Sequence, residues 1–195
     1  MPRAIAILAS CLALPAAALT VAGCAGSAKS NSFGTFTDCS KIGPVANAPD
    51  PDGDQRGVLA GSKPQPQGDL VDLKIARRNG KLCVQFWAAE PIKPYVAYVL
   101  AMRPQDAETP LVQLEATVFP GEDPHALLHA GGRDGFRTVS ATVGVRDNQL
   151  SILVDRKPFD AQGLAKVFDA FRFQARSAVV TADDGRLTDC LPACN

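Results

Sequence analysis

The segment LVDLKIARRNGKLCVQFWA, residues 70–88, decides the fold class because apolar and polar residues alternate on both sides of Asn79-Gly80. In the first run Val71, Leu73 and Ile75 fall on one face, and the second run repeats the pattern with Leu82, Val84, Phe86 and Ala88. This alternation is the period of a half-buried strand, and Asn-Gly is the pair that tight hairpin turns prefer. The segment therefore predicts a β-hairpin.

Runs of similar composition follow along the chain. They are rich in Val, Leu, Thr or aromatic residues, are bounded by Pro, Gly, Asp or Asn, and cover residues 95–102, 111–119, 137–145, 150–154 and 172–180. Asp147-Asn148 predicts the turn of a second hairpin. Because short strands at this spacing are typical of sandwiches, we expect a mostly β protein, an antiparallel β-sandwich of about seven or eight strands.

Helical spacing is confined to residues 160–170, with Leu164, Val167, Phe168 and Phe171 on one stripe, and Gly163 lies within this segment. Glycine weakens a helix, so we expect at most one short helix. Residues 44–68 contain Pro49, Pro51, Pro64 and Pro66 together with several Gly, Asp and Gln. Such a segment carries neither a regular helix nor an inner strand and is expected to be a long surface loop.

The N-terminal segment has the parts of a secretory signal. Arg3 is its only charge, residues 4–19 are apolar, and Val21-Ala22-Gly23-Cys24 places small residues before a cysteine. The tetrapeptide resembles the lipobox of bacterial lipoproteins, which implies cleavage between Gly23 and Cys24 and a diacylglycerol on the Cys24 thiol. Two or more acyl chains, at roughly 0.8 kcal/mol per methylene, hold a protein stably on a bilayer. The alternative is a membrane-spanning anchor over residues 4–22, which Pro15 and the lack of a following basic cluster disfavour.

These features divide the chain into a signal peptide (1–23), a lipidated N-terminus with a flexible tether (24–36) and one β-sandwich domain (37–195). The tether is expected because residues 25–36 are dominated by small and polar types. Lysine plus arginine and aspartate plus glutamate number 20 each, so no overall field favours nucleic acid.

Six cysteines are present, and Cys11 leaves with the signal while Cys24 takes the lipid. An even remainder in an exported chain favours disulfides, here among Cys39, Cys83, Cys190 and Cys194. Three pairings are open. We lean toward both C-terminal cysteines reaching back into the domain, since a bridge between Cys190 and Cys194 ties off little chain entropy. Their spacing lacks the paired short intervals of structural zinc sites.

Residues 50–189 resemble the sandwich shared by family 9 carbohydrate-binding modules and DOMON domains. The resemblance lies in the loop Asp50-Pro-Asp-Gly-Asp54, in Gly68-Asp69-Leu70 before the hairpin, and in a late strand with Phe171, Phe173 and Ala175. It implies a sandwich fold, and a shared fold does not by itself carry function.

Asp50, Asp52 and Asp54 alternate along the loop and form a candidate calcium site, because Ca²⁺ prefers carboxylate oxygens. The EF-hand pattern is not met, since Gln55 and Gly61 stand where that loop needs glycine and glutamate. The alternative is an acidic, solvated turn. Further candidate ligands are Asp69, Asp183, Asp184 and Asp189.

His125 and His129 are the only histidines, and their spacing allows a shared face. The segment lacks the glutamate that a metalloprotease motif needs, so two exposed histidines beside a turn are the simpler interpretation. The DOMON resemblance implies a further possibility, haem ligation by Met102 and one of these histidines.

Trp87, Tyr95 and Tyr98 are candidate ligand-binding residues, since aromatic faces stack on sugar rings. The alternative for Trp87 is packing within the hairpin. Family 9 modules clamp sugar between two tryptophans, and this chain has one.

We do not expect an enzyme, because neither a Gly-x-Ser-x-Gly elbow nor a phosphate-binding glycine loop occurs in the sequence. The expected protein is a lipid-anchored envelope lipoprotein on the outer face of the bacterial cytoplasmic membrane, with a non-catalytic domain that binds a small ligand, glycan or envelope protein. The loop over residues 50–68 is its expected contact surface. Alternatives are a structural or accessory subunit of an envelope complex, a calcium-dependent glycan-binding module or a haem-binding module.

Overall fold

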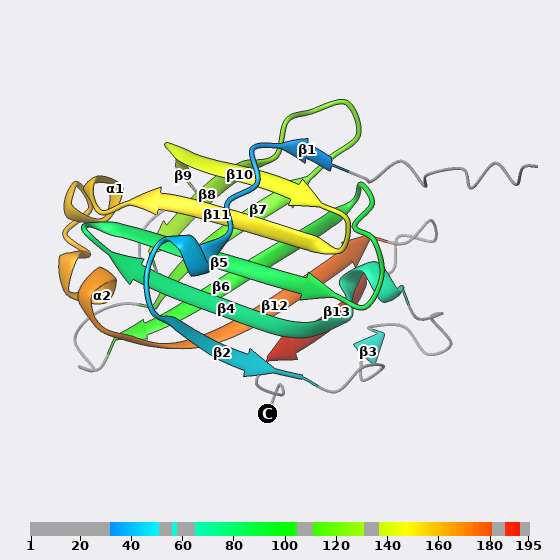
Figure 1. Cartoon of the computed structure of the whole chain (residues 1–195), viewed down its shortest axis with the longest axis horizontal. Helices are drawn as coiled ribbons and strands as arrows, with labels where there is room; N and C mark the ends of the chain where they lie inside the picture. The colour runs from blue at the N-terminus through cyan, green and yellow to red at the C-terminus, as the bar shows by residue number, and fades with distance from the viewer. Residues whose placement is uncertain are drawn as a thin grey trace, which may run out of the picture.

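The computed structural model describes residues 32–50, 56–57, 65–104, 111–130, 137–180 and 186–191. They form two antiparallel sheets packed face to face (Figure 1), which confirms the predicted β-sandwich. The first sheet has the order β1 (Ser32–Gly34), β10 (Ala141–Arg146), β11 (Gln149–Asp155), β5 (Lys81–Ala88), β4 (Leu70–Arg78), β2 (Val45–Pro49). The second has the order β3 (Arg56–Gly57), β13 (Arg186–Leu191), β12 (Phe171–Val180), β6 (Val96–Pro104), β7 (Val112–Val118), β8 (His125–Ala130), β9 (Arg137–Val139).

The predicted hairpin is confirmed as β4–β5. Arg78 pairs with Lys81, and Asn79 and Gly80 both have positive φ, as a type I′ turn requires. A register shift between Leu70 and Asp72 changes one detail of the alternation. Leu70 is fully buried there, whereas Val71, predicted to share a face with Leu73, is half-buried. A β-bulge adds one residue to a strand and so moves the alternation by one position.

The core lies between the sheets and is built by alternate residues of the long strands. Phe86 of β5 and Tyr98 of β6 meet across it with ring centroids 5.4 Å apart, and both are fully buried. Leu82, Val84, Leu100 and Leu114 extend the same layer. The packing of two amphipathic sheets is therefore the main source of stability.

Several elements differ from the sequence expectation. The strand predicted over residues 137–145 is interrupted at Ser140, so that β9 pairs with β8 in the second sheet while β10 pairs with β11 in the first. The predicted single helix is two short ones, α1 (Lys157–Asp160) and α2 (Ala165–Asp169), because Gly163 between them has a φ of +72°.

Short strands appear where none was predicted. β2 falls within the segment predicted to be a loop. It is an edge strand of the first sheet, and an edge strand tolerates a proline such as Pro49. β1 belongs to the segment assigned to the tether, so the sheet begins before residue 37. β8 and β13 were not predicted either, and they extend the second sheet on both sides of β12, β6 and β7.

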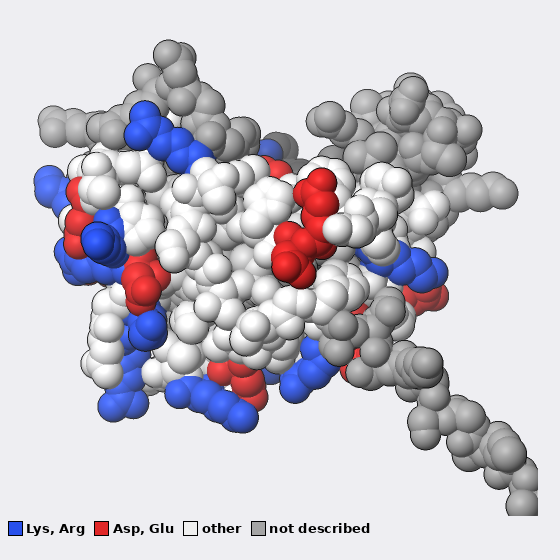
Figure 2. Space-filling model, turned by 90° about the horizontal axis from the view of Figure 1, so that it is seen from above, with Lys and Arg blue, Asp and Glu red and all other residues white. Residues whose placement is uncertain are grey.

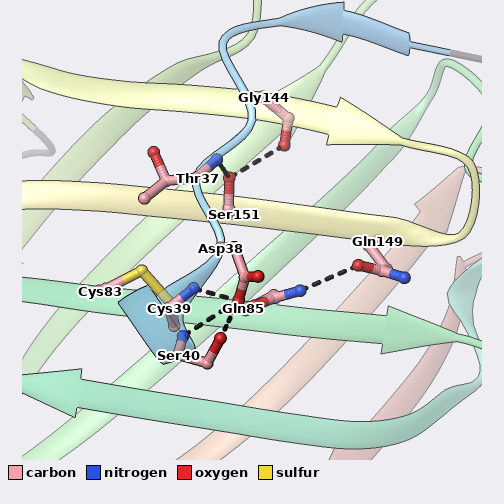
Figure 3. The surroundings of a disulfide bond; sticks show 9 residues. All are labelled: Thr37, Asp38, Cys39, Ser40, Cys83, Gln85, Gly144, Gln149 and Ser151. Carbon is pink, nitrogen blue, oxygen red and sulfur yellow. Dashed lines mark hydrogen bonds between the residues drawn. A yellow bond between two sulfur atoms is a disulfide. The ribbon is translucent and has the colours of Figure 1, made fainter. Parts of the chain in front are cut away.

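Residues 35–42 cross the outer face of the first sheet, and we call them the strap (Figure 3). The Thr37 N–H donates to Ser151 Oγ at 2.8 Å and the Cys39 N–H to Gln85 Oε1 at 3.2 Å. A Cβ at Gly144 would lie 2.2 Å from the Phe36 nitrogen, so only glycine allows this close approach. The strap thus provides partners for two buried polar side chains of the sheet.

A disulfide joins Cys39 of the strap to Cys83 of β5, with a Cα–Cα distance of 5.4 Å (Figure 3). The expectation that both C-terminal cysteines reach back to these positions is therefore wrong. The strap brings Cys39 directly onto β5, which sequence separation alone did not reveal. Cys190, at the end of β13, is also disulfide-bonded, and Cys194 lies outside the described residues.

Candidate functional site

Basic side chains gather at one end of the sandwich. This end, which we call the basic end, contains the β4–β5 turn, α1, α2, the end of β6 and the start of β12, and lies on the left in Figures 1 and 2. Its cations are Arg77, Arg78, Lys81, Arg103, Arg137, Arg156, Lys157, Lys166 and Arg172. The charge of the whole chain is balanced, whereas among the described residues this end has more cations than carboxylates.

Three acidic residues at the basic end are engaged in ion pairs. Lys81 Nζ lies 3.0 Å from the Asp155 carboxylate. Arg156 bonds both oxygens of Asp169, at 2.5 and 2.8 Å, and also Asp160, at 3.0 Å. Hydrogen bonds to Asp169 and Asp160 raise the pKa of Arg156. In the part of the chain that the structure describes, the other cations form no ion pair and can meet an anionic partner.

A groove opens at the edge of the sandwich next to the basic end. We call it the edge groove; it has a volume of about 550 Å³ and is lined by Pro44, Val45, Ala46, Ile75, Arg77, Asp169, Ala170, Phe171 and Phe173. The lining comes from β2, β4, the end of α2 and the start of β12, and is mostly apolar. Phe171 and Phe173 are only partly buried although they pack against the core. The groove therefore gives an apolar ligand access to the layer between the sheets.

Arg77 supplies the cation of the edge groove. Its Nη1 donates to the carbonyl oxygen of Phe168 at 2.5 Å, which holds the guanidinium beside α2. Within the described residues Arg77 forms no ion pair, while its neighbour Asp169 is matched by Arg156. A guanidinium has five donors and binds carboxylate or phosphate oxygens in pairs. The edge groove thus combines an apolar wall with one anion-binding group.

A second cleft, of about 490 Å³, opens on the opposite edge of the basic end. It is lined by Arg137, Thr138, Val139, Ser140, Asp155, Lys157, Pro158, Ala161 and Gln162. This second cleft has two cations and a lining about as apolar as that of the edge groove, but none of its lining residues is aromatic.

The predicted calcium ligands lie only partly within the described structure. Asp52, Asp54, Asp183 and Asp184 are outside it. Asp50 follows β2 and its N–H donates to the Val71 carbonyl at 3.0 Å. Asp69 and Asp189 are buried at the same corner, where Asp189 accepts the N–H of Leu70 at 2.5 Å. Over the described residues, no group of three or more His, Cys, Asp or Glu is arranged to hold a metal ion.

The three predicted aromatic residues do not form one surface. Tyr98 is fully buried in the core, and its hydroxyl donates to the Gln67 carbonyl. Trp87 is half-buried on the first sheet, with Lys74 Nζ 4.2 Å from the centre of its ring. Tyr95 is 54% exposed at the start of β6, in the second sheet. Tyr98 is therefore unavailable to a ligand, and Trp87 has the hairpin packing given as the alternative.

Met102 and the two histidines lie on opposite faces of the second sheet. Met102 is fully buried, whereas His125 and His129 of β8 are half-buried at the alternate positions to buried Ala126 and Leu128. The Thr117 hydroxyl lies 3.5 Å from His125 Nε2. Burial raises the pKa of nearby Glu115, and the charge of His125 partly opposes this. Such a geometry does not bring a methionine and a histidine to one haem.

Sequence reasoning missed the edge groove because four separate segments build it. Arg77-Arg78 next to the predicted hairpin turn was the visible signal, since two cations follow an otherwise regular alternation. The sequence predicts Phe171 on a helical stripe and, with Phe173, on a late strand. Their position beside β2 and β4 in the groove is a long-range contact that has no local pattern.

Fold and groove together define a β-sandwich with an apolar edge site and a basic rim. Comparison with protein-family models, curated proteins and solved structures finds no match for this chain. Within the described residues, no helix is long and apolar enough to cross a membrane.

Proposed function

We propose that this protein is a lipid-anchored lipoprotein of the bacterial envelope whose non-catalytic domain binds an amphipathic anion in the edge groove. The ligand class is a single apolar chain with a carboxylate or phosphate group. The observation that carries this proposal is the placement of Arg77, without an ion pair in the described structure, in a mostly apolar groove whose other charged residue, Asp169, is paired with Arg156.

The surroundings of the groove support the anionic character of the ligand. Arg78, Lys166 and Arg172 lie at the same end, and the acidic Asp169 is matched by Arg156. An anion approaching this end meets a positive field, which raises its rate of association. The apolar wall then removes the chain from water, at about 25 cal/mol per Å² of buried surface.

The anchor rests on the sequence Val21-Ala22-Gly23-Cys24. The buried Cys39–Cys83 disulfide supports export, since disulfides persist in oxidising compartments and are rare in the cytosol. Replacing Cys24 with serine removes the thiol that takes the lipid. We expect C24S to lose metabolic labelling by palmitate and to leave the membrane fraction; a variant that fractionates as the parent does contradicts the anchor.

Decanoate and decanol test the groove, because they share a chain length and differ in charge. We expect decanoate to bind and R77Q to weaken it about tenfold, the loss of one charge-assisted hydrogen bond, while decanol binding stays unchanged. The matched control is R137Q in the second cleft, which removes a cation from the same end. Binding is measured by calorimetry below the micellar concentration of each probe.

A second variant separates the apolar wall from the cation. F173W adds volume within the groove and is expected to weaken both probes equally. If decanoate fails to bind the parent protein, or if R137Q weakens it as much as R77Q does, the edge groove is not the site.

A further inference from the structure

The end of the sandwich opposite the basic end presents two exposed aromatic side chains. Tyr95 is 54% exposed and Phe119 is 43% exposed, the largest exposed hydrophobic residues within the described structure. Tyr95 precedes Val96 of β6, and Phe119 follows Val118 of β7. Because Val96 and Val118 pair in the antiparallel ladder, Tyr95 and Phe119 are neighbours beyond its end. We call this surface the aromatic end.

Tyr95 has a strained backbone that its burial does not explain. Its φ is +72°, a conformation that glycine and asparagine adopt readily and bulky residues rarely. The Tyr95 N–H donates to the Val118 carbonyl at 2.7 Å and fixes this geometry. Strain retained at an exposed aromatic residue points to a role for the side chain outside the fold.

The N-terminal segment leaves the domain at this same end. Ser32 of β1 pairs with Arg146, the last residue of β10. The carbonyl oxygen of the next residue, Asp147, accepts the N–H of Ile92, in the connection that leads to Tyr95. The start of β1, the β10–β11 turn and the β5–β6 connection therefore lie together, on the right in Figure 1.

The length of the preceding chain limits how far the domain can stand from its anchor. Seven residues lie between Cys24 and Ser32, and this stretch of chain spans at most about 30 Å when fully extended. The nine residues of β4 alone extend about 30 Å along the sandwich. Because the chain enters the domain at the aromatic end, an anchor at Cys24 favours the approach of that end to the bilayer over the approach of the basic end.

We infer that the aromatic end is a second membrane contact, in which Tyr95 and Phe119 enter the interface of the bilayer that holds the Cys24 lipid; this inference rests on the proposed anchor. Tyrosine and phenylalanine bring apolar area to the interface, and the tyrosine hydroxyl stays at its polar side. The described exposed charges here are two cations, Lys93 and Arg146, and four carboxylates, Glu90, Glu122, Asp123 and Asp147. Contact with a neutral phosphatidylcholine bilayer therefore depends on the rings and is insensitive to salt, whereas anionic lipid is expected to weaken it.

The test places a single tryptophan at either end of the full chain expressed with its signal. In a Trp87→Phe background, Phe119→Trp reports the aromatic end and Arg78→Trp, beside the β4–β5 turn, reports the basic end as a matched control. The acylated proteins are reconstituted in phosphatidylcholine vesicles with and without brominated acyl chains. We expect quenching of the Phe119→Trp emission alone, equally at low and high salt.

Two results overturn the inference: equal quenching of both tryptophans, or quenching of the Arg78→Trp protein alone. Failure of the anchor is seen separately, as loss of acylation or of vesicle flotation. In that case the unacylated chain is coupled through the Cys24 thiol to a maleimide lipid, and the same quenching comparison decides the orientation. A Tyr95→Ser, Phe119→Ser double variant of the C24S chain should bind vesicles about tenfold more weakly than C24S alone, and equal binding contradicts the contact.

Discussion

At Tyr95, stability and the proposed membrane contact make opposing demands on one residue. Asparagine tolerates a φ near +72° because its short side chain avoids the clash that a larger residue meets there. We expect Tyr95→Asn to stabilise the fold by about 1 kcal/mol while weakening vesicle binding. Urea denaturation measures the first effect, with Tyr95→Phe as the control that keeps both ring and strain. Destabilisation by Tyr95→Asn would show that the tyrosine serves the fold instead.

Tyr98 couples the stability of the core to pH. Complete burial raises its pKa far above the usual value of about 10 for tyrosine. Its contribution to stability is therefore fully present below pH 10 and is lost as the pH rises, because only the unfolded chain releases the proton easily. In the alkaline range, Tyr98 should make the unfolding free energy fall by about 1.4 kcal/mol per pH unit. We expect the Tyr98→Phe variant to lack this part of the decline. At neutral pH it should cost about 1 kcal/mol for the lost hydrogen bond to the Gln67 carbonyl. Urea midpoints from pH 7 to 11 make the comparison, and parallel curves for the two proteins contradict it.

The strap depends on the disulfide for its place on the first sheet. Cys39 and Cys83 are separated by 44 residues, and closing a loop of that size restricts the unfolded chain. We expect the double variant Cys39→Ser, Cys83→Ser to lose about 2–4 kcal/mol of stability. Hydrogen exchange should accelerate first at Thr37 and Cys39, whose N–H groups bond to the sheet. Unchanged protection there would mean that the hydrogen bonds alone hold the strap.

Elements defined by local patterns were predictable, and those set by long-range pairing were not. The β4–β5 hairpin followed from alternation and Asn79-Gly80, which act over neighbouring residues. The interruption at Ser140 follows from pairing with two different sheets, which no local signal encodes. The bulge at Leu70 shifted Val71 for the same reason, since Asp189 from the far end of the chain holds the Leu70 N–H.

The candidate site shows the same limit at the scale of the molecule. Net charge from the sequence is zero, and only folding brings Arg77, Lys166 and Arg172 to one end and Tyr95 and Phe119 to the other. The anchor signal could be predicted from the sequence, because processing enzymes recognise a signal segment as a linear motif. The edge groove was not, because β2, β4 and β12 come together only in the folded sandwich.

The two sheets should unfold as one unit because the chain links them at several points. The segment from β9 to β10 passes from the second sheet to the first at Ser140, and the Phe86 and Tyr98 rings pack across the interface. Unfolding one sheet would therefore expose the apolar face of the other, at a cost of about 25 cal/mol per Å². We expect a single urea transition. Trp87 fluorescence reports the first sheet, and the near-ultraviolet dichroism of a Trp87→Phe variant reports Tyr98 in the second. The two curves should coincide once each is normalised to the stability of its own protein. Transitions that differ in steepness or show a plateau would mean that the sheets are separate cooperative units, and the edge groove would then lie between parts that can move apart.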